Sequence, residues 1–333
     1  MIKGETRVSI ILPCFNVEDF IERTYKSIIS QTINSWEAIF VDDGSSDNTY
    51  VELLKIQKKD SRVKVIQKKN AGSGVARNKG AEVAQGKFLY FMDPDDELKI
   101  NTLEILVDTA ENTNSEMVIC GYQEIDIVNK STKKFGTTNI LTTLTNDEVK
   151  KVYPVLTHKK IFNPPWNKLF STKFWQENKL EFPAVKKGQD ALLNMIAFKC
   201  VERIVVIPDK LYCYYIGRVG SAQTTLSDND FEYFKINQRY ETDLMRFWEI
   251  YSENYFIERI ISFCFGDSVK VYRYVKSRNE GVKQFVELWN KRITKSEVEN
   301  ISFLKVYKNK VLLIKLISMK IPILNYFIQK KIN

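Results

Sequence analysis

The chain has 333 residues, of which 44% are hydrophobic and 27% are charged, as expected for one large or two smaller folded domains. Five scattered cysteines without a CxxC pair argue against a zinc or disulfide framework, and the single histidine, His158, excludes sites built from several histidines. The net charge of +9 favours an anionic partner such as a nucleotide, a membrane surface or nucleic acid.

The amino terminus and the hydropathy pattern bear on location. The first five residues lack the apolar core of a signal peptide, and no uncharged run reaches the roughly 20 residues that span a bilayer. Together with the cysteine usage, these features predict a cytoplasmic protein. We expect His158 to lie on its surface.

From Val8 onward, short apolar runs alternate with segments of helical length. Strands are predicted at 8–12, 38–41, 63–66 and 88–92, and helices at 17–31, 51–56 and 73–84. This alternation is typical of right-handed βαβ units in an α/β fold, a mostly parallel, Rossmann-like sheet with helices on both faces. Ligands bind outside the carboxyl ends of such strands, so residues 13–16, 42–43 and 93–96 should meet in one crevice.

A run of acids follows the fourth predicted strand. Residues 93–97 read Asp-Pro-Asp-Asp-Glu, and four carboxylates this close repel one another unless a cation lies among them. Oxygen ligands suit hard divalent ions, so the run predicts a Mg²⁺ or Mn²⁺ site. The alternative is a strand-to-helix turn in which Asp95 or Asp96 caps a helix that starts near Leu98.

Residues 70–78 contain two glycines and open the third predicted helix. Free N–H groups and the positive end of the helix dipole favour an anion there, and Arg77 adds a fixed charge. An ordinary loop and helix start is the alternative. The segment is neither a Walker loop nor a GxGxxG motif after a first strand. In the same crevice, Asp43 could accept hydrogen bonds from a base or ribose, while Asp93 and Asp95 hold a metal that bridges a pyrophosphate.

Five motifs in order give residues 8–98 a specific resemblance to the nucleotide-sugar half of the family 2 glycosyltransferases, which have the GT-A fold. The motifs are Ile-Leu-Pro-Cys-Phe-Asn at 11–16, Ser-Ile-Ile-Ser-Gln-Thr at 27–32, Val-Asp-Asp-Gly-Ser-Ser-Asp at 41–47, Asn-Ala-Gly at 70–72 with Ala-Arg-Asn-Lys-Gly at 76–80, and Phe-Met-Asp-Pro-Asp-Asp at 91–96. The resemblance points to enzymes of bacterial capsule, exopolysaccharide or O-antigen synthesis.

This resemblance implies a set of nucleotide-sugar-binding residues, namely Pro13, Phe15, Asn16, Asp42, Asp43, Arg77 and Asp93. Pro13 and Phe15 would line the nucleobase pocket, Asp43 would contact the base, and Arg77 would lie near the phosphates. Asp93 and Asp95 would form the DxD motif that holds Mn²⁺ or Mg²⁺, with Asp95 as the leading candidate for a direct ligand.

Residues 163–170, Asn-Pro-Pro-Trp-Asn-Lys-Leu-Phe, form a candidate acceptor segment. The two prolines forbid a regular helix and present Trp166 beside polar groups, an arrangement that suits a sugar ring. The segment resembles the Trp-Asn-Lys-Leu element of polysaccharide-building members of the family, which implies acceptor-side roles for Trp166 and Asn167. The alternative is a core tryptophan under a loop.

The run 186–194 is expected to supply the catalytic base. An inverting sugar transfer needs a carboxylate that removes the proton of the acceptor hydroxyl, while a metal takes up charge on the leaving diphosphate. In many relatives the Asp of a Gly-Glu-Asp run is this base, which by position is Asp190. The chain departs from that pattern at Gln189, where the family usually has Glu. Alternatively, Asp190 is only the N-cap of a helix at 191–200.

Further elements are predicted along the rest of the chain. They are helices at 103–112, 147–156, 231–251 and 257–275, strands at 117–122, 205–208 and 211–215, the last two as edge strands, and a polar hairpin tip or mobile loop at 129–139. Arg218 and Ser221 give a weak match to a further family element. Residues 301–333 carry seven lysines and no acid among apolar runs, so this basic amphipathic tail could lie on an anionic membrane. Packing on the sheet domain or on a dimer partner is the alternative.

Together these features predict a GT-A domain at 1–225, with a nucleotide-sugar half at 1–100 and an acceptor half at 101–225, followed by a helical C-terminal region at 226–333. The expected function is a metal-dependent, inverting hexosyltransferase. It would move a sugar from a nucleotide-diphosphate donor, a UDP-sugar by preference, to a hydroxyl of a glycan or lipid-linked oligosaccharide at the inner face of the cell membrane.

Two rival functions make different predictions. A sugar nucleotidyltransferase should carry a basic glycine-rich loop after its first strand, which residues 13–16 do not form. A non-catalytic basic module that binds nucleotide or membrane and retains the fold should be indifferent to Asp95→Ala. Nucleic-acid binding is not expected, because the basic residues do not form an aromatic-interleaved motif.

Overall fold

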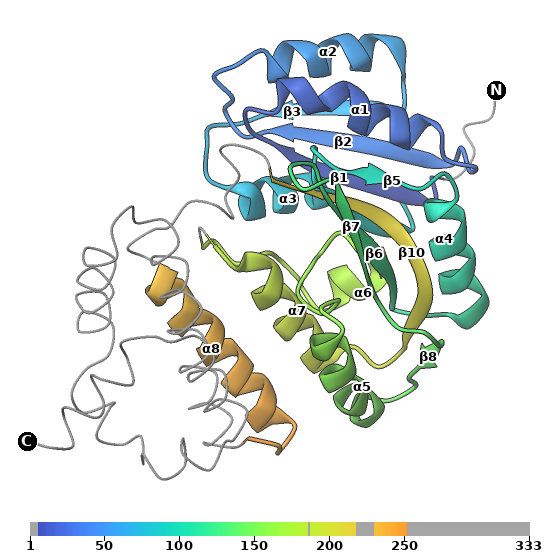
Figure 1. Ribbon diagram of the computed structural model, residues 1–333, viewed down its shortest axis with the longest axis vertical. Coiled ribbons are helices and arrows are strands. Elements are labelled where there is room, and N and C mark those ends of the chain that lie inside the picture. Colours follow the sequence, from blue (N-terminus) through green and yellow to red (C-terminus); the bar gives the residue numbers. More distant parts are fainter. Residues whose placement is uncertain (1–5, 186, 218–229, 252–333) are drawn as a thin grey trace, which may run out of the picture. The chain divides into compact units, whose positions relative to one another are not determined.

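One mixed sheet organises the residues that the computed structural model describes, which are 6–185, 187–217 and 230–251 (Figure 1). Its strands are β1 (Val8–Cys14), β2 (Trp36–Asp42), β3 (Val63–Gln67), β4 (Phe88–Phe91), β5 (Glu97–Leu98), β6 (Met117–Asp126), β7 (Ser131–Phe135), β8 (Leu141–Thr142), β9 (Lys168–Ser171) and β10 (Ile204–Ile216). The strand order is β3-β2-β1-β4-β9-β6-β10-β5, with β7 paired to β6 and β8 paired to β10.

The helices connect these strands in chain order. They are α1 (Glu18–Ile29), α2 (Thr49–Lys59), α3 (Ser73–Glu82), α4 (Thr102–Thr113), α5 (Asn146–His158), α6 (Thr172–Glu177), α7 (Gln189–Cys200) and α8 (Asp230–Phe247). Helices α1 and α2 lie on one face of β1–β3 and α3 lies on the other (Figure 1). The chain turns back toward β4 after β3, so right-handed crossovers place α3 opposite the first two helices.

The first four strands form the parallel part of the sheet that the apolar runs predicted. Strand β1 pairs in parallel with both β2 and β4, and all three strands are buried along their whole length. Helix α3 lies directly on β1, because a Cβ added at Gly80 would collide with the side chain of Ile11. These predicted strands and helices are therefore confirmed, with boundaries that differ by a few residues.

The second half of the sheet mixes strand directions. Strand β9 is antiparallel to both β4 and β6, and β6 and β10 are parallel to each other. The prediction of two edge strands at 205–208 and 211–215 is wrong, because β10 is one continuous strand between β6 and β5. Its register shifts between Val206 and Tyr212, and this irregularity accommodates Pro208, which cannot donate a ladder hydrogen bond.

The structural alternative for the acidic turn, residues 93–97, is not observed. No helix starts near Leu98, because Glu97 and Leu98 pair with Cys213 and Tyr212 of β10 as strand β5. The next helix, α4, begins only at Thr102. Asp95 and Asp96 are therefore not helix caps.

Most of the remaining local predictions agree with the structure. Residues 131–135 return along β6 as a hairpin, and α5 and α8 match the predicted helices. His158 is exposed at the end of α5. Arg218, Ser221, the helix at 257–275 and the tail at 301–333 lie outside the described residues. Within the described part of the chain, no helix combines the length and apolar character that a membrane crossing requires.

Candidate active site

The carboxyl ends of β1, β2 and β4 meet at one edge of the sheet. Cys14 lies opposite Asp42 in the ladder between β1 and β2, and Ile11 lies opposite Phe91 in the ladder between β1 and β4. The N–H of Asp43 continues this pairing by donating to the carbonyl of Cys14 at 2.8 Å. The segments after these strands are therefore neighbours, as their positions in the sequence predicted.

The loop after β1 exposes one aromatic ring. Pro13 is buried within the strand, whereas Phe15 is 47% exposed. Asn16 adopts a left-handed conformation with φ of 51°, which asparagine tolerates better than most residues. Its side-chain oxygen accepts a 2.8 Å hydrogen bond from the N–H of Ser46, and its own N–H donates to Ser45 Oγ at 3.1 Å. Asn16 thus joins the loops after β1 and β2 and leaves Phe15 at the surface.

Asp42 is fully buried at the end of β2 and acts on the loop that follows. Its Oδ1 accepts a 3.3 Å hydrogen bond from the N–H of Ser45, and its Oδ2 accepts from the amide of Gln67 at 3.2 Å. The carboxylate therefore ties β2 to β3 and shapes the turn beyond it.

Asp43 performs a similar task for the loop before α3. Its Oδ1 accepts hydrogen bonds from the Lys68 ammonium and from the N–H of Ala71 at 3.0 Å, and its Oδ2 accepts from the N–H of Gly72 at 2.8 Å. Gly72 has a φ of 95°, a conformation that side chains disfavour. Asp43 thus positions the start of α3, and Oδ2 has one lone pair that no described donor uses.

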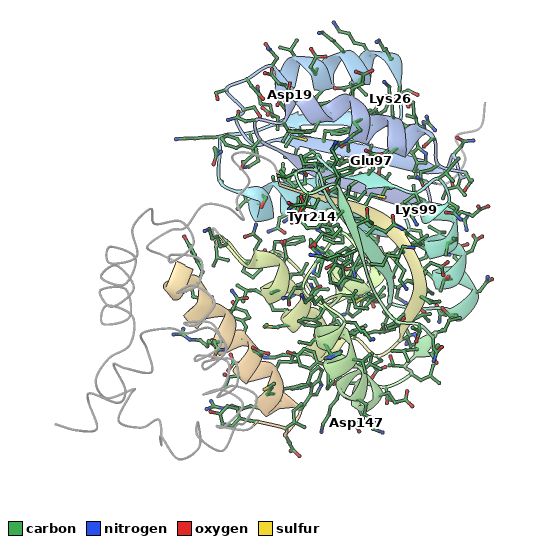
Figure 2. All side chains as sticks on the ribbon, in the orientation of Figure 1. Asp19, Lys26, Glu97, Lys99, Asp147 and Tyr214 are labelled. Carbon is green, nitrogen blue, oxygen red and sulfur yellow. The ribbon has the colours of Figure 1, made fainter. Side chains whose placement is uncertain are left out.

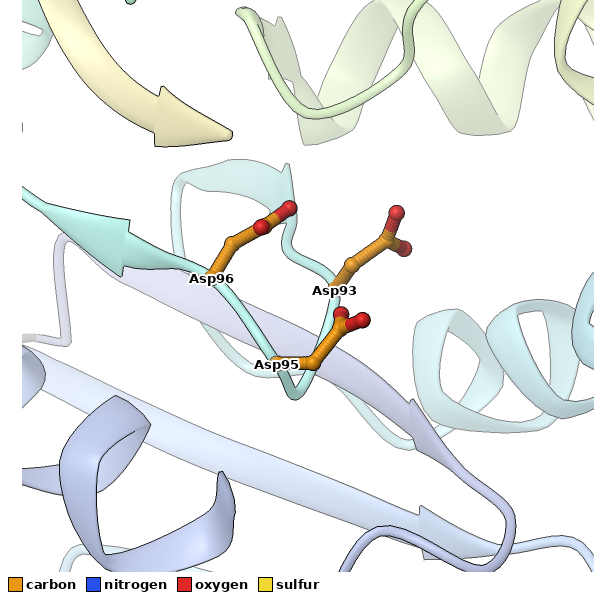
Figure 3. Close-up of side chains that lie close together, drawn as sticks. All are labelled: Asp93, Asp95 and Asp96. Atoms are coloured by element: carbon orange, nitrogen blue, oxygen red, sulfur yellow. The ribbon is translucent and has the colours of Figure 1, made fainter. Parts of the chain in front are cut away.

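Three acids lie together after β4 (Figure 3). Asp93, Asp95 and Asp96 each offer a carboxylate oxygen, and these oxygens lie within 4.8 Å of one another. The Asp93 side chain is 28% exposed, whereas Asp95 and Asp96 are 8% and 1% exposed. An all-oxygen set of this kind fits a hard divalent cation such as Mg²⁺ or Mn²⁺.

A single guanidinium group joins this acidic loop to α7. Arg77 Nη2 donates to Asp93 Oδ1 at 2.7 Å, and Nη1 donates to Asp190 Oδ1 at 2.8 Å. The Arg77 side chain is only 4% exposed, while that of Asp190 is 35% exposed. The structure therefore brings the predicted base next to the predicted metal motif, although 97 residues separate Asp93 from Asp190 in the sequence.

The electrostatics of this bridge favour a proton acceptor. Burial raises the pKa of Asp190, the positive charge of Arg77 opposes that rise, and the nearby Asp93 carboxylate adds to it. The pKa of Arg77 is itself raised by the two carboxylates, although burial acts in the opposite direction. A partly exposed carboxylate with a raised pKa is well suited to general base catalysis.

Asp190 is not the N-cap of α7, so the alternative structural role is not observed. The N-cap is Gly188, with a φ of 80°, and Asp190 lies in the first turn of the helix. The preceding Gln189 is buried and donates its amide to Ser73 Oγ at the start of α3. The departure from the family pattern at Gln189 thus forms a neutral link between the amino-terminal ends of α3 and α7.

Trp166 lies beneath this region and is only 6% exposed. Its ring stacks on Tyr212 at a centroid distance of 4.3 Å and an interplanar angle of 10°, and on Tyr214 at 5.2 Å and 25°. This arrangement matches the alternative of a core tryptophan under a loop. Its ring packs against two tyrosine side chains of β10.

The neighbours of Trp166 are buried polar residues that hold the proline-containing loop. Asn167 is fully buried and donates its amide to the carbonyl of Cys120 at 3.0 Å. Lys168 is also fully buried, and burial lowers its pKa to about 7. The Lys168 ammonium donates to Asn167 Oδ1 and to the carbonyl oxygens of Ile161, Phe162 and Pro164, at distances of 2.6 to 3.0 Å.

Sequence reasoning missed the contact between β10 and the acidic loop. The Tyr212 hydroxyl donates to Asp96 Oδ2 at 2.8 Å and accepts from the N–H of Asp93 at 3.1 Å. Burial, and next the charge of Asp93, raise the pKa of Asp96 well above its ordinary value. Because 116 residues separate Tyr212 from Asp96, local patterns in the sequence carried no signal for this contact.

The chain is similar in sequence to known proteins. The model of the family described as "Glycosyl transferase family 2" matches residues 9–176, half of the chain. Glycosyltransferase EpsJ of Bacillus subtilis is 29% identical over 62% of the chain and 60% of its own length. The poly(ribitol-phosphate) beta-glucosyltransferase of Bacillus spizizenii is 27% identical over 64% of the chain, which spans only 33% of that relative.

A solved structure supports the fold class. Residues 1–349 of TarS from S. aureus, crystallised in complex with UDP-GlcNAc, superimpose with a TM-score of 0.62 at 22% identity, covering 85% of this chain and 81% of that one. The predicted GT-A architecture is thereby confirmed for the described residues. The predicted division into a domain and a C-terminal region stays a prediction.

Proposed function

Because the chain belongs to glycosyl transferase family 2, we propose that it transfers a sugar, with inversion, from a UDP-linked donor to a hydroxyl group of a lipid-linked surface glycan. The Arg77 bridge is the observation that carries this proposal. The buried Arg77 guanidinium donates to both the Asp190 and the Asp93 carboxylates, so the proposed base and the proposed metal motif are neighbours. A transfer enzyme needs both groups at the same centre.

The donor nucleotide would bind at the edge formed by the first two strands. Phe15 offers an exposed ring on which a base can stack, and Pro13 and Asn16 shape the loop that carries it. The remaining lone pair of Asp43 Oδ2 suits an N–H donor, which uracil has at N3. The amino-terminal end of α3 faces this region with a positive dipole that favours the diphosphate. Asp42 acts indirectly by holding the loop after β2.

The acidic loop would hold the divalent ion. Asp93 and Asp95 are the residues proposed to ligate Mn²⁺ or Mg²⁺, since their carboxylates lie close together at the end of β4. A bound divalent cation supplies positive charge that offsets the charge developing on the leaving diphosphate. Arg77 contributes a second, permanent positive charge next to Asp93.

Asp190 would act as the general base. As the acceptor oxygen forms its bond to the anomeric carbon and the bond from that carbon to the diphosphate breaks, the hydroxyl proton passes to the Asp190 carboxylate. Arg77 holds that carboxylate in place and opposes the rise of its pKa, which keeps it ionised and ready to accept the proton. Attack from the side opposite the diphosphate gives inversion.

The acceptor would approach from the side of β6, β9 and β10. Trp166 and Asn167 are buried, so we propose that they shape this side from beneath. The lipid-linked nature of the acceptor and a peripheral position at the inner face of the membrane rest on the basic tail at 301–333. The name of the B. spizizenii relative, which includes a poly(ribitol-phosphate), is consistent with a surface-polymer acceptor.

Calorimetric titration with UDP, GDP, CDP and dTDP, each with Mn²⁺ and with EDTA, tests the donor half. We expect metal-dependent binding of UDP that Asp95→Ala abolishes. The control is Asp147→Ala, which removes an exposed acid that is labelled at the bottom of Figure 2, well below Glu97 in that view. Binding of no nucleotide would contradict the proposal and favour a non-catalytic basic module that retains the fold.

A further inference from the structure

The third acid of the loop differs from the other two in its surroundings. Asp96 is 1% exposed, and both of its carboxylate oxygens accept hydrogen bonds from β10. Oδ2 accepts from the Tyr212 hydroxyl at 2.8 Å, and Oδ1 accepts from the N–H of Tyr215 at 2.9 Å. Figure 3 shows Asp93 and Asp96 on opposite limbs of the turn, with Asp95 at its tip. Each oxygen of the Asp96 carboxylate is therefore hydrogen-bonded to β10.

The Tyr212 hydroxyl connects Asp96 to the start of the same turn. Its one proton is donated to Asp96, so the oxygen is free to accept the 3.1 Å hydrogen bond from the N–H of Asp93. The ring is fixed by stacking on Trp166, at a centroid distance of 4.3 Å. One rigid side chain thus holds both limbs of the acidic turn.

Side chains of helix α1 contact main-chain carbonyl groups on the opposite side of the turn. Thr24 Oγ1 lies 2.8 Å from the carbonyl of Pro94 and 2.9 Å from that of Asp96, and the Arg23 guanidinium donates to the carbonyl of Asp95. The turn is therefore fixed from two sides. On the β10 side, the Asp96 carboxylate accepts hydrogen bonds from the Tyr212 hydroxyl and from the N–H of Tyr215.

We propose that Asp96 is a positioning residue rather than a metal ligand. Acting through Tyr212, it holds the turn so that the carboxylates of Asp93 and Asp95 converge on the divalent cation. This inference rests on the proposed function, because it assumes that the acidic loop binds a metal. It also assigns Tyr212 of β10, and indirectly Trp166, a role in donor binding.

A double-mutant cycle tests this assignment. The Mn²⁺ affinity of the UDP-saturated, full-length protein is measured from the electron paramagnetic resonance signal of free Mn²⁺, for wild type, Asp96→Asn, Tyr212→Phe and the double variant. Loss of a residue that orients metal ligands costs about 10- to 100-fold in metal affinity. We expect a loss in that range for each single variant, and no further loss in the double variant, because both substitutions break the same link.

The cycle has a matched control on the neighbouring strand. Tyr122 pairs with Tyr212 in the ladder between β6 and β10, but its hydroxyl donates to the carbonyl of Lys160 and not to the acidic turn. Tyr122→Phe should leave the Mn²⁺ affinity unchanged. UDP affinity in EDTA and the melting temperature are recorded for every variant, so that a general loss of structure is recognised.

Two results would overturn the inference. If Tyr212→Phe leaves the Mn²⁺ affinity unchanged, or if the losses of the two single variants multiply in the double variant, Asp96 acts on the metal directly. Tyr212→Phe alone decides the matter if Asp96→Asn does not fold. A wild-type protein that binds neither UDP nor Mn²⁺ would instead contradict the proposed function, and the inference with it.

Discussion

The two halves of the sheet build the candidate site in opposite ways. In the half proposed to bind the nucleotide, which we call the nucleotide half, each candidate site segment follows its strand directly, and the carboxylates of Asp42 and Asp43 accept hydrogen bonds from backbone N–H groups of nearby loops. In the half proposed to bind the acceptor, which we call the acceptor half, the amide of Asn167 and the ammonium of Lys168 donate to buried backbone carbonyl groups. The first half carries its candidate functional side chains on short turns. The second half supports the site through buried side chains.

This contrast determines what a substitution should do in each half. Residues on the exposed edge should change binding or rate with little effect on folding, whereas residues beneath it should change stability first. Arg77, which joins Asp93 to Asp190, connects the two halves and should affect the rate through its charge. The following predictions test this division in order of decreasing effect.

The largest effect is expected from Asp190→Asn. An amide cannot accept the proton of the acceptor hydroxyl, and loss of a general base lowers rates by about 10²- to 10⁴-fold. Sugar transfer from UDP-sugar to acceptor should fall by this factor, while calorimetry shows UDP affinity within a few-fold of wild type. Asp209→Asn, on β10 and outside the site, serves as a control. Transfer at the wild-type rate would show that the base is another residue.

Lys168→Met should mainly lower stability. The substitution keeps an apolar chain of similar length but removes the Lys168 donor of Asn167 Oδ1 and of the Pro164 carbonyl. The carbonyls of Ile161 and Phe162 keep hydrogen bonds from the side-chain amides of Asn167 and Asn194. Unsatisfied buried polar groups cost about 1–3 kcal/mol each, so the free energy of unfolding should fall by about 2 kcal/mol or more. Urea titration measures this loss, and Lys173→Met, whose side chain is 81% exposed, should change it by less than about 1 kcal/mol.

The lowered pKa of Lys168 predicts that the free energy of unfolding depends on pH. Its pKa is about 7 in the folded protein and 10.5 as the ordinary value, so between these pH values the unfolded chain binds a proton that the folded chain has released. The contribution of Lys168 to the free energy of unfolding should therefore rise from pH 7 toward pH 10 and be flat below pH 7. Wild type should gain stability relative to Lys168→Met over this window. An unchanged difference would contradict the lowered pKa.

The difference between the two halves of the sheet also explains which features could be predicted from the sequence. The parallel strands and the loops at their carboxyl ends were predictable, because each belongs to a continuous pattern of a few residues. The roles of Arg77 and Asp190 stay predictions, although the structure brings the two side chains together. The two false edge strands at 205–208 and 211–215 arose where pairing between β5 and β10 helps to decide the local structure. Such pairing joins segments more than 100 residues apart, and no window of sequence contains both partners.

Local sequence patterns also did not indicate which residues of the proline-containing loop are buried. Trp166 and Asn167 stand beside prolines in the sequence, which favoured an exposed loop, yet both are buried. Their burial follows from long-range contacts with Tyr212 and Cys120. Local patterns therefore did not indicate which of these side chains reach the surface.

Arg77→Gln should shift the pH dependence of transfer. The positive charge of Arg77 opposes the rise in the pKa of Asp190, so its removal should raise that pKa further. A base works only when ionised, hence the acid limb of the pH profile of kcat/KM should move to higher pH. Hydrogen bonds to charged groups contribute about 1.5–3 kcal/mol, so the rate below the wild-type optimum should fall about 10- to 100-fold.

Arg77→Lys separates charge from geometry. Lysine keeps the positive charge but cannot donate to Asp93 and Asp190 from one planar group. The acid limb should therefore stay near its wild-type position while the rate at the pH optimum falls. An acid limb that does not move in Arg77→Gln would show that the charge of Arg77 does not control Asp190.

The smallest effect is expected from Phe15→Ala, at the exposed edge of the nucleotide half. Stacking of a base on an aromatic ring contributes about 1–3 kcal/mol, and Phe15, which is 47% exposed, should give a value near the lower end. UDP affinity should therefore fall by about five- to tenfold, with kcat and the melting temperature unchanged. Phe15→Tyr keeps the ring and should bind UDP as wild type does. A drop in stability on removal of this ring would show that the nucleotide half, like the acceptor half, depends on packing at its edge, and the contrast between the two halves would fail there.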